Sequence, residues 1–313
     1  MKYRPYLSGC ADVSEIGVGG WQLSDSAVWS SMSDAEATSL VHHALDLGIN
    51  FFDTAPNYGL GTSEQRLGSA LKGVDRDRFI INTKFGHNAE DEFDFESSSL
   101  RDSVEGSLRR LGVETIDSLL LHNPPAEYLD GNHTDHYEIL DALVAEGKIK
   151  GYGASLDTYN DMKRLMDTTG SKVIEACFNI LFQDSARAFE QAQAQGVAII
   201  AKIPLDSGWL SGKYSADSQF DDIRSRWSAE DKRTRERLVQ GVRERLPADM
   251  PMSQAAIAFC LAHDAVTTVI PGNKNLDQLE DNITSTRLSL PQATLDDLHR
   301  FYEDEVRPLG IPW

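Results

Sequence analysis

Residues 49–86 read INFFDTAPNYGLGTSEQRLGSALKGVDRDRFIINTKFG. The two ends of this stretch are short apolar runs, Ile49–Ala55 and Phe79–Gly86, of the length of buried strands. Between them, Ser63–Leu71 has the apolar spacing of an amphipathic helix. A strand, a helix and a strand in this order predict a βαβ unit, in which two parallel strands are joined by a crossover helix.

The same alternation continues in both directions along the 313 residues. Six more apolar runs are predicted as strands: Glu15–Gly20, Ser118–Asn123, Ile149–Ser155, Val173–Asn179, Val197–Pro204 and Thr267–Gly272. Further helices are predicted at Ser33–Leu47, Ser97–Leu111, Asp135–Glu146, Tyr159–Asp167, Ser185–Gln195, Glu230–Leu246, Ser253–Ala262, Leu276–Thr284 and Leu295–Tyr302. At the start of the first of these, Ser33 and Glu36 have the spacing of a capping box.

Eight strands in one chain without a break in composition predict a closed (β/α)8 barrel. We expect a single domain over residues 1–313, with a short N-terminal hairpin and a long loop, Ser207–Trp227, after the seventh strand. A loop of this length is either a functional cover or a solvated excursion. The alternative fold is a doubly wound sheet, but Gln22 stands where the third glycine of a GxGxxG turn should follow Gly17 and Gly19.

Composition and charge exclude several kinds of partner. The formal net charge of −19 disfavours nucleic acid and anionic lipid. No apolar run approaches the length of a spanning helix, and the N-terminal residues do not resemble a signal peptide, so we expect a cytoplasmic protein. The three cysteines, Cys10, Cys177 and Cys260, have no metal-ligand spacing, and we expect no metal.

Three polar side chains end consecutive predicted strands: Asp53, Lys84 and His122. The carboxyl ends of the strands of a (β/α)8 barrel meet at one face, and that face carries the active site. We therefore expect these three side chains to converge, although each on its own could be a solvated strand end or, for His122, a buried histidine.

Four segments resemble the aldo-keto reductase superfamily. They are DTAPNYG at 53–59, followed by Ser63-Glu64 and Leu67-Gly68; NTKFG at 82–86; LLHNP at 120–124; and IPGNKNLDQLEDN at 270–282. They occur in the family's order over nearly the whole chain. The resemblance implies a barrel that binds NADP(H) or NAD(H) and interconverts a carbonyl compound and an alcohol, with Asp53, Tyr58, Lys84 and His122 as the catalytic residues.

The residue types suit this chemistry. Side chains supply no hydride, so a nicotinamide must, while a phenol such as Tyr58 can transfer the proton. A nearby ammonium is expected to lower the phenol pKa, and Lys84, held by ionised Asp53, would do so. His122 would direct an N–H toward the carbonyl oxygen.

The resemblance also implies a cofactor site. Ser155, Glu175 and Lys202 occupy family positions near the nicotinamide, but many relatives have Gln at the second and an aromatic residue at the third. Many relatives also have Asn where this chain has Leu156. These departures indicate an unusually polar pocket. The pyrophosphate and adenosine positions are Leu205, Ser207, Gly208, Leu210, Gly272, Lys274, Gln278 and Asn282.

Lys274 is the candidate contact for an adenosine 2′-phosphate, which favours NADP(H) over NAD(H). Four aromatic residues are candidate walls of a substrate pocket: Trp21, Phe85, Trp209 and Trp227. The substrate class stays open among sugars, small aldehydes, pyridoxal and α-hydroxy ketones, and we expect a monomer by default.

Two other functions remain open at this point. The resemblance extends to the β subunits of voltage-gated potassium channels, so the chain could be a regulatory subunit that binds NADP(H) without acting as an enzyme. A barrel lyase could instead use Lys84 as a Schiff-base nucleophile, which requires a lysine of depressed pKa.

Overall fold

The computed structural model describes residues 1–24 and 32–312. Its main sheet contains eight parallel strands in the order β10-β9-β8-β7-β6-β5-β4-β3. Their bounds are β3 Val18–Gly19, β4 Phe51–Asp53, β5 Ile80–Phe85, β6 Ile116–His122, β7 Ile149–Leu156, β8 Val173–Cys177, β9 Ala198–Lys202 and β10 Val266–Ile270. All eight predicted strands are present, and neighbours in the sequence are neighbours in the sheet.

The sheet closes between its first and last strands. Parallel bridges join Ile16 to Val269 and Gly19 to Gly272. The main-chain nitrogen of Gly17 also donates to the carbonyl of Val269 at 2.9 Å. The prediction of a closed (β/α)8 barrel is therefore confirmed, and the doubly wound alternative is wrong.

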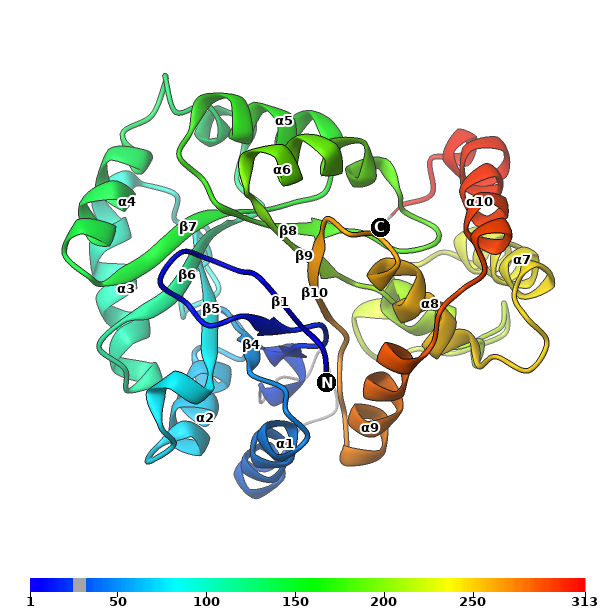
Figure 1. The fold of residues 1–313 in the computed structure, drawn as a ribbon, viewed down its shortest axis with the longest axis horizontal. Helices are drawn as coiled ribbons and strands as arrows, with labels where there is room; N and C mark the ends of the chain where they lie inside the picture. Colours follow the sequence, from blue (N-terminus) through cyan, green and yellow to red (C-terminus); the bar gives the residue numbers. More distant parts are fainter. Residues whose placement is uncertain (25–31, 313) are drawn as a thin grey trace.

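Helices surround the strands (Figure 1). Their bounds are α1 Asp34–Asp46, α2 Thr62–Leu71, α3 Ser97–Leu111, α4 His136–Ala145, α5 Tyr159–Thr168, α6 Phe189–Gln195, α7 Ala229–Arg245, α8 Met252–Leu261, α9 Leu276–Thr284 and α10 Gln292–Phe301. The capping box of Ser33 and Glu36 is formed at the start of α1. The predicted helix Ser185–Gln195 instead begins with a 3₁₀ segment, Asp184–Ala188, where the Ser185 hydroxyl donates to the carbonyl of Cys177 at 2.8 Å.

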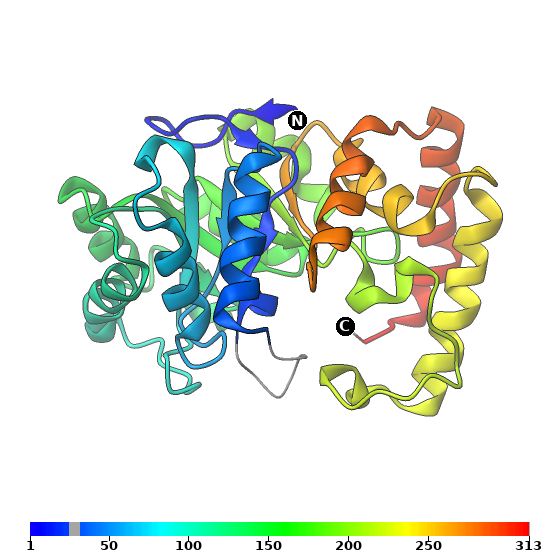
Figure 2. The ribbon, with the colours of Figure 1, turned by 90° about the horizontal axis from the view of Figure 1, so that it is seen from below.

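The N-terminal hairpin, β1 (Tyr3–Arg4) paired with β2 (Val13–Ser14), covers one end of the barrel (Figure 2). Its Leu7 and Val13 pack on an apolar layer inside the strands, made of Phe51, Ile80, Leu120, Val173, Ile200 and Ile270. This apolar layer closes the amino ends of the strands. The carboxyl ends, where a barrel carries its site, face the opposite way.

The long loop after β9 lies at that opposite end (Figure 2). It contains two 3₁₀ segments, η5 (Asp206–Ser211) and η6 (Ile223–Arg226). Trp209, Tyr214, Phe220 and Trp227 form one group of edge-to-face ring contacts within it. The loop therefore has a packed interior of its own.

Within residues 1–24 and 32–312, no helix has both the length and the apolar character needed to cross a bilayer. The same residues contain no group of three or more His, Cys, Asp and Glu side chains placed to hold a metal ion.

Candidate active site

Lys84 lies at the centre of the open end of the barrel. It comes from β5, and its side chain is fully buried. The Nζ atom donates to Asp53 Oδ1 at 2.6 Å and to the carbonyl of Thr54 at 3.1 Å, and it lies 3.2 Å from Glu175 Oε2. The ammonium is thus held between two carboxylates, of which the sequence predicted only Asp53.

Asp53 is fixed from its other side by a series of buried hydrogen bonds. Asn82 Nδ2 donates to Asp53 Oδ1 at 2.7 Å, and the Ser118 hydroxyl donates to Asn82 Oδ1 at 2.5 Å. The hydroxyls of Tyr6 and Ser118 lie 2.6 Å apart. These contacts run through the barrel interior from the N-terminal hairpin to the site. The sequence pattern did not predict these contacts, because Asn82 and Ser118 have the spacing of ordinary strand residues.

A close main-chain approach places the end of β4. A Cβ atom on Gly20 would lie 2.4 Å from the carbonyl oxygen of Asp53. Only glycine permits this contact. The glycine-rich turn after Val18 thus serves the packing of two strand ends against each other.

Tyr58 lies on the loop between β4 and α2, beside Lys84 and His122. Lys84 Nζ is 5.1 Å from the centre of the Tyr58 ring. The rings of Tyr58 and His122 are 5.9 Å apart and nearly perpendicular, and the Trp21 ring stacks on Tyr58 at 5.8 Å. The structure therefore brings together the four predicted catalytic residues and one of the predicted pocket walls.

The pKa shifts give the protonation states of the site. Burial raises the pKa of Tyr58 well above its ordinary value, and Lys84 offsets only part of this. Burial works to lower the pKa of Lys84, but Asp53 and Glu175 outweigh it and raise that pKa. Burial, and then Lys84, hold the pKa of His122 far below its usual range. At neutral pH the site thus contains a phenol, an ammonium and a neutral imidazole. Lys84 does act to lower the pKa of Tyr58, as expected from the sequence, but burial raises this pKa by more, so the net shift is upward.

The two carboxylates compete for Lys84. Burial and the charge of Glu175 raise the pKa of Asp53 to about 7. Burial also works to raise the pKa of Glu175, but Lys84 and Lys202 outweigh it and lower that pKa. The proton that this pair takes up near neutrality therefore resides mainly on Asp53.

A second ammonium lies next to this pair. Ser155 donates to Glu175 Oε1 at 3.2 Å, and Lys202 Nζ donates to Ser155 Oγ at 2.9 Å. Lys202 also contacts Asn123 Oδ1 and Asp157 Oδ1, each at 2.9 Å. The predicted nicotinamide-side residues Ser155, Glu175 and Lys202 thus form one hydrogen-bonded cluster at the ends of β7, β8 and β9. Asp157 was not predicted as a site residue, although it follows directly on β7.

The predicted pyrophosphate segment, Leu205 to Leu210, has an unusual backbone. Asp206, Ser207 and Gly208 have φ values of 46°, 51° and 97°. Successive left-handed residues can form a concave turn of N–H groups that suits an anion. The segment is held by a fully buried ion pair in which Arg235 Nε donates to Asp206 Oδ2 at 3.2 Å. This pair was missed because its two members are 29 residues apart.

The predicted adenosine segment is a turn leading into α9. Asn275 caps the helix, and Gln278 Oε1 accepts from the main-chain nitrogen of Lys274 at 2.9 Å. Asn282 Nδ2 donates to Asn273 Oδ1 at 2.8 Å. Two predicted contacts, Gln278 and Asn282, thus shape the turn, and Gly272 leaves space that the side chain of Gln22 occupies. Burial and the charge of Arg224 lower the pKa of Lys274, so two cations lie near each other here.

The other predicted pocket walls lie in packed aromatic groups. Phe85 is buried and contacts Phe95 and His136, while Trp209 and Trp227 contact each other within the long loop. Within residues 1–24 and 32–312, Trp21 is the one predicted wall whose ring contacts that of the candidate catalytic tyrosine, Tyr58.

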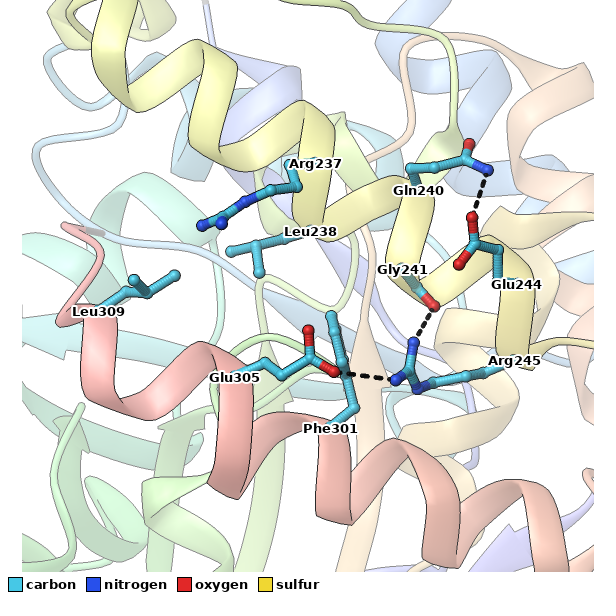
Figure 3. A pocket seen from close by; sticks show the side chains of 9 residues that line it. All are labelled: Arg237, Leu238, Gln240, Gly241, Glu244, Arg245, Phe301, Glu305 and Leu309. Carbon is cyan, nitrogen blue, oxygen red and sulfur yellow. Dashed lines mark hydrogen bonds and ion pairs between the residues drawn. The ribbon is translucent and has the colours of Figure 1, made fainter.

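Two cavities lie away from the tetrad. One, of about 500 Å³, lies between α7 and the C-terminal segment (Figure 3). There Arg245 donates hydrogen bonds to the carbonyl oxygen of Gly241 and to the carboxylate of Glu305. The other, of about 720 Å³, lies beside the ends of α2 and α3 and is lined in part by Arg76 and Lys150. Both of these cations bind the buried Asp117, which places them in a structural ion cluster.

Comparison with known proteins agrees with this geometry. Residues 15–303 match the Aldo/keto reductase family. The chain is 29% identical over 297 residues to the D-threo-aldose 1-dehydrogenase of Pseudomonas sp, covering 84% of this chain and 87% of the relative. It is 23% identical over 316 residues to the NADH-specific methylglyoxal reductase of Escherichia coli, covering 94% and 96%. An aldo-keto reductase from Bacillus halodurans in its holo form superposes with a TM-score of 0.80 at 28% identity, covering 96% of each chain. With a barrel that ends in the Asp53, Tyr58, Lys84 and His122 cluster and a family match over most of its length, this chain belongs to the aldo/keto reductase family.

Proposed function

We propose that the protein is an NADP(H)-dependent oxidoreductase that interconverts a small aldehyde or ketone and the alcohol, with Tyr58 as the proton donor and acceptor. The observation that carries this proposal is that the Tyr58 ring lies beside both the ammonium of Lys84, at 5.1 Å, and the imidazole of His122, at 5.9 Å.

In the reductive direction, the bound nicotinamide supplies the hydride. Tyr58 is a protonated phenol at neutral pH, because burial raises its pKa, so it can give its proton to the oxygen of the former carbonyl. Lys84 then lies beside the phenolate and stabilises it, while Asp53 keeps the ammonium in place. His122 is neutral and can donate one ring N–H to the carbonyl oxygen, which orients it and stabilises developing charge.

The chain's own residues fit a nicotinamide cofactor. Glu175 Oε2 is buried with the ammonium of Lys84 at 3.2 Å as its ion-pair partner, and it accepts no geometrically defined hydrogen bond from the described residues, so it can still accept one from an amide N–H beside the tetrad. Ser155, Glu175 and Lys202 would hold the nicotinamide end, and the left-handed turn of Ser207 and Gly208, with Leu205 and Leu210, would hold the pyrophosphate. Gly272, Lys274, Gln278 and Asn282 would hold the adenosine end.

The preference for NADP(H) rests on Lys274, with Arg224 near it. One relative, from Escherichia coli, is named as specific for NADH, so the NADPH and NADH affinities must be compared directly. The high pKa of Lys84 weighs against a Schiff-base lyase, because that nucleophile must be a neutral amine.

Titration of the purified protein with NADPH and, separately, with NADH tests the proposal, with quenching of tryptophan fluorescence as the readout. We expect tight binding of NADPH and weaker binding of NADH, and oxidation of the bound cofactor when carbonyl compounds are added. Equal binding would remove the role of Lys274. Tight binding with no turnover of any carbonyl compound would favour a regulatory subunit, and the absence of binding would refute the oxidoreductase assignment.

A further inference from the structure

Tyr6 lies between β1 and β2, on the hairpin that covers the closed end of the barrel (Figure 2). Its ring meets the ring of Phe51 edge-on, with 5.5 Å between the ring centres. Arg4 fastens this hairpin, because it forms an ion pair with Glu15 at 2.8 Å and donates to the main-chain carbonyl of Leu261 at 2.8 Å. The hydroxyl of Tyr6 is therefore held in a fixed position at the closed end.

Three buried polar residues lie side by side across the strands next to this hydroxyl. Asp53 on β4 is the partner of Asn82 on β5 in the sheet, and Asn82 is the partner of Ser118 on β6. Partners in neighbouring strands point to the same face of a sheet, which here is the inside of the barrel. The inward residues two positions away from them are apolar: Phe51, Ile80 and Leu120. A buried polar group is costly unless it is hydrogen-bonded, so this row of polar side chains requires an explanation.

The hydrogen bonds of this row run in one direction only. Asn82 Nδ2 donates to Asp53 Oδ1 at 2.7 Å, because an ionised carboxylate only accepts. Asn82 Oδ1 therefore faces Ser118 and accepts from its hydroxyl at 2.5 Å. A serine hydroxyl has a single proton, so Tyr6 must be the donor in the contact of 2.6 Å between the hydroxyls of Tyr6 and Ser118. Burial raises the pKa of Tyr6 well above its ordinary value, so this phenol keeps the proton that it donates.

This chain of hydrogen bonds transmits orientation and not protons, because the amide of Asn82 does not release its N–H proton at neutral pH. The hydroxyl of Ser118 keeps the amide from turning, so its N–H group stays on Asp53 Oδ1. The same oxygen accepts from Lys84 Nζ at 2.6 Å. A hydrogen bond to the ionised form of an acid lowers its pKa, so Asn82 works against the burial that raises the pKa of Asp53.

We propose that Tyr6 is a positioning residue for the active site, although it lies at the closed end of the barrel. It acts through the hydroxyl of Ser118 and the amide of Asn82, which hold Asp53 against Lys84. The inference rests on the proposed function, in which ionised Asp53 keeps the ammonium of Lys84 in place.

The test measures the ionisation of Asp53 itself. NMR spectroscopy of protein labelled at the aspartate carboxyl carbons follows this group with pH, and the loss of its signal in Asp53→Asn assigns it. Among the described residues, the other titratable groups that face Asp53 are Lys84 from β5, Glu175 from β8 and Tyr58 from the loop after β4. None of these three is changed in the variants, so a shift in the titration reports the hydrogen-bonded chain.

Ser118→Ala leaves Asn82 Oδ1 without its donor, and we expect it to raise the pKa of Asp53 from about 7 by about one pH unit. Tyr6→Phe keeps the aromatic ring and removes one uncharged hydroxyl, and it should raise the same pKa by about half a unit. Because the two hydroxyls act in series, the double variant should raise it no further than Ser118→Ala alone. The acidic limb of kcat/KM for a carbonyl substrate should move by the same amounts.

Tyr3→Phe is the matched control on the same hairpin. It removes a hydroxyl that donates to the main-chain carbonyl of Gly48 at 2.9 Å and has no part in the chain. If the hairpin acted only as a structural cover, the loss of either hydroxyl would affect the site alike. We expect Tyr3→Phe to leave the titration of Asp53 in place.

A titration that stays at the wild-type pH in both Ser118→Ala and Tyr6→Phe, or one that moves as far in Tyr3→Phe, would overturn the positioning role and leave the oxidoreductase assignment intact. Shifts that add up in the double variant would also overturn it, because Tyr6 would then act by another route. The expected shifts in a protein that turns over no carbonyl compound would support the chain from Tyr6 to Asp53 and refute the proposed reaction.

Discussion

Replacing Glu175 by Gln tests whether two carboxylates share the ammonium of Lys84. Asp53 Oδ1 and Glu175 Oε2 contact the same Nζ atom at 2.6 Å and 3.2 Å, so the two oxygens lie within about 6 Å of each other. At about 6 Å and an effective dielectric constant of about 20, the repulsion between them is about 3 kcal/mol, which corresponds to about two pH units. Glutamine keeps the shape of the side chain and removes this repulsion.

The raised pKa of Asp53 decides in which direction the acidic limb of the pH profile should move in Glu175→Gln. Burial and Glu175 raise the pKa of Asp53 to about 7. In the wild type, the pair therefore takes up a proton as the pH falls through about 7, and Lys84 loses one charged partner there. Without Glu175, Asp53 stays ionised to lower pH. We expect the acidic limb of the kcat/KM profile to lie near pH 7 in the wild type and one to two units lower in Glu175→Gln.

The assay is the pH dependence of kcat/KM for one carbonyl substrate at saturating NADPH, from pH 5 to pH 9. The apparent pKa of this acidic limb belongs to the coupled pair of carboxylates and not to either carboxylate alone. Glu190→Gln, which changes an exposed carboxylate on α6, is the matched control and should leave the limb in place. An acidic limb that stays at the wild-type pH in Glu175→Gln would refute the reasoning.

Three further predictions concern other parts of the site. Tyr58→Phe should abolish turnover with nearly unchanged cofactor binding, because it removes only the proton donor; a large loss of NADPH affinity in the fluorescence titration would count against this role. Lys274→Met should weaken NADPH binding by about 5- to 10-fold and NADH binding much less, since one charge contact is worth about 1 kcal/mol; equal losses for both cofactors would assign Lys274 another role. Asp206→Asn should lower the free energy of unfolding by about 3 kcal/mol, because it leaves the buried guanidinium of Arg235 without its counter-charge; urea unfolding measures this, and a loss below about 1 kcal/mol would show that the pair is not needed for stability.

Much of the fold could be predicted from local patterns. The alternation of apolar runs and amphipathic stretches produced eight strands in the right order, since each pattern depends on residues only a few positions apart. The ends of three strands also predicted Asp53, Lys84 and His122 as neighbours, because parallel strands align their carboxyl ends. The family resemblance added Tyr58, which lies on a loop where no periodicity applies.

Other features depend on contacts between residues far apart in the chain. Asp53 and Glu175 share the ammonium of Lys84 although they lie 122 positions apart in the sequence. The residues next to each of them give no sign of this contact. Trp209 and Trp227 were predicted as pocket walls from their type, but the loop packs them against each other. Tyr6 comes next to Ser118 only when the hairpin folds over the end of the barrel.

The sequence by itself determined which chemical groups reach the open end of the barrel, because strand direction and motif order are local properties. Tertiary structure alone decided how those groups are protonated and which of them lack partners. A pKa depends on burial and on every charge nearby, so the same tyrosine and lysine can have a lowered or a raised value according to what surrounds them. Here burial keeps Tyr58 protonated, and a second carboxylate brings the pKa of Asp53 close to neutrality.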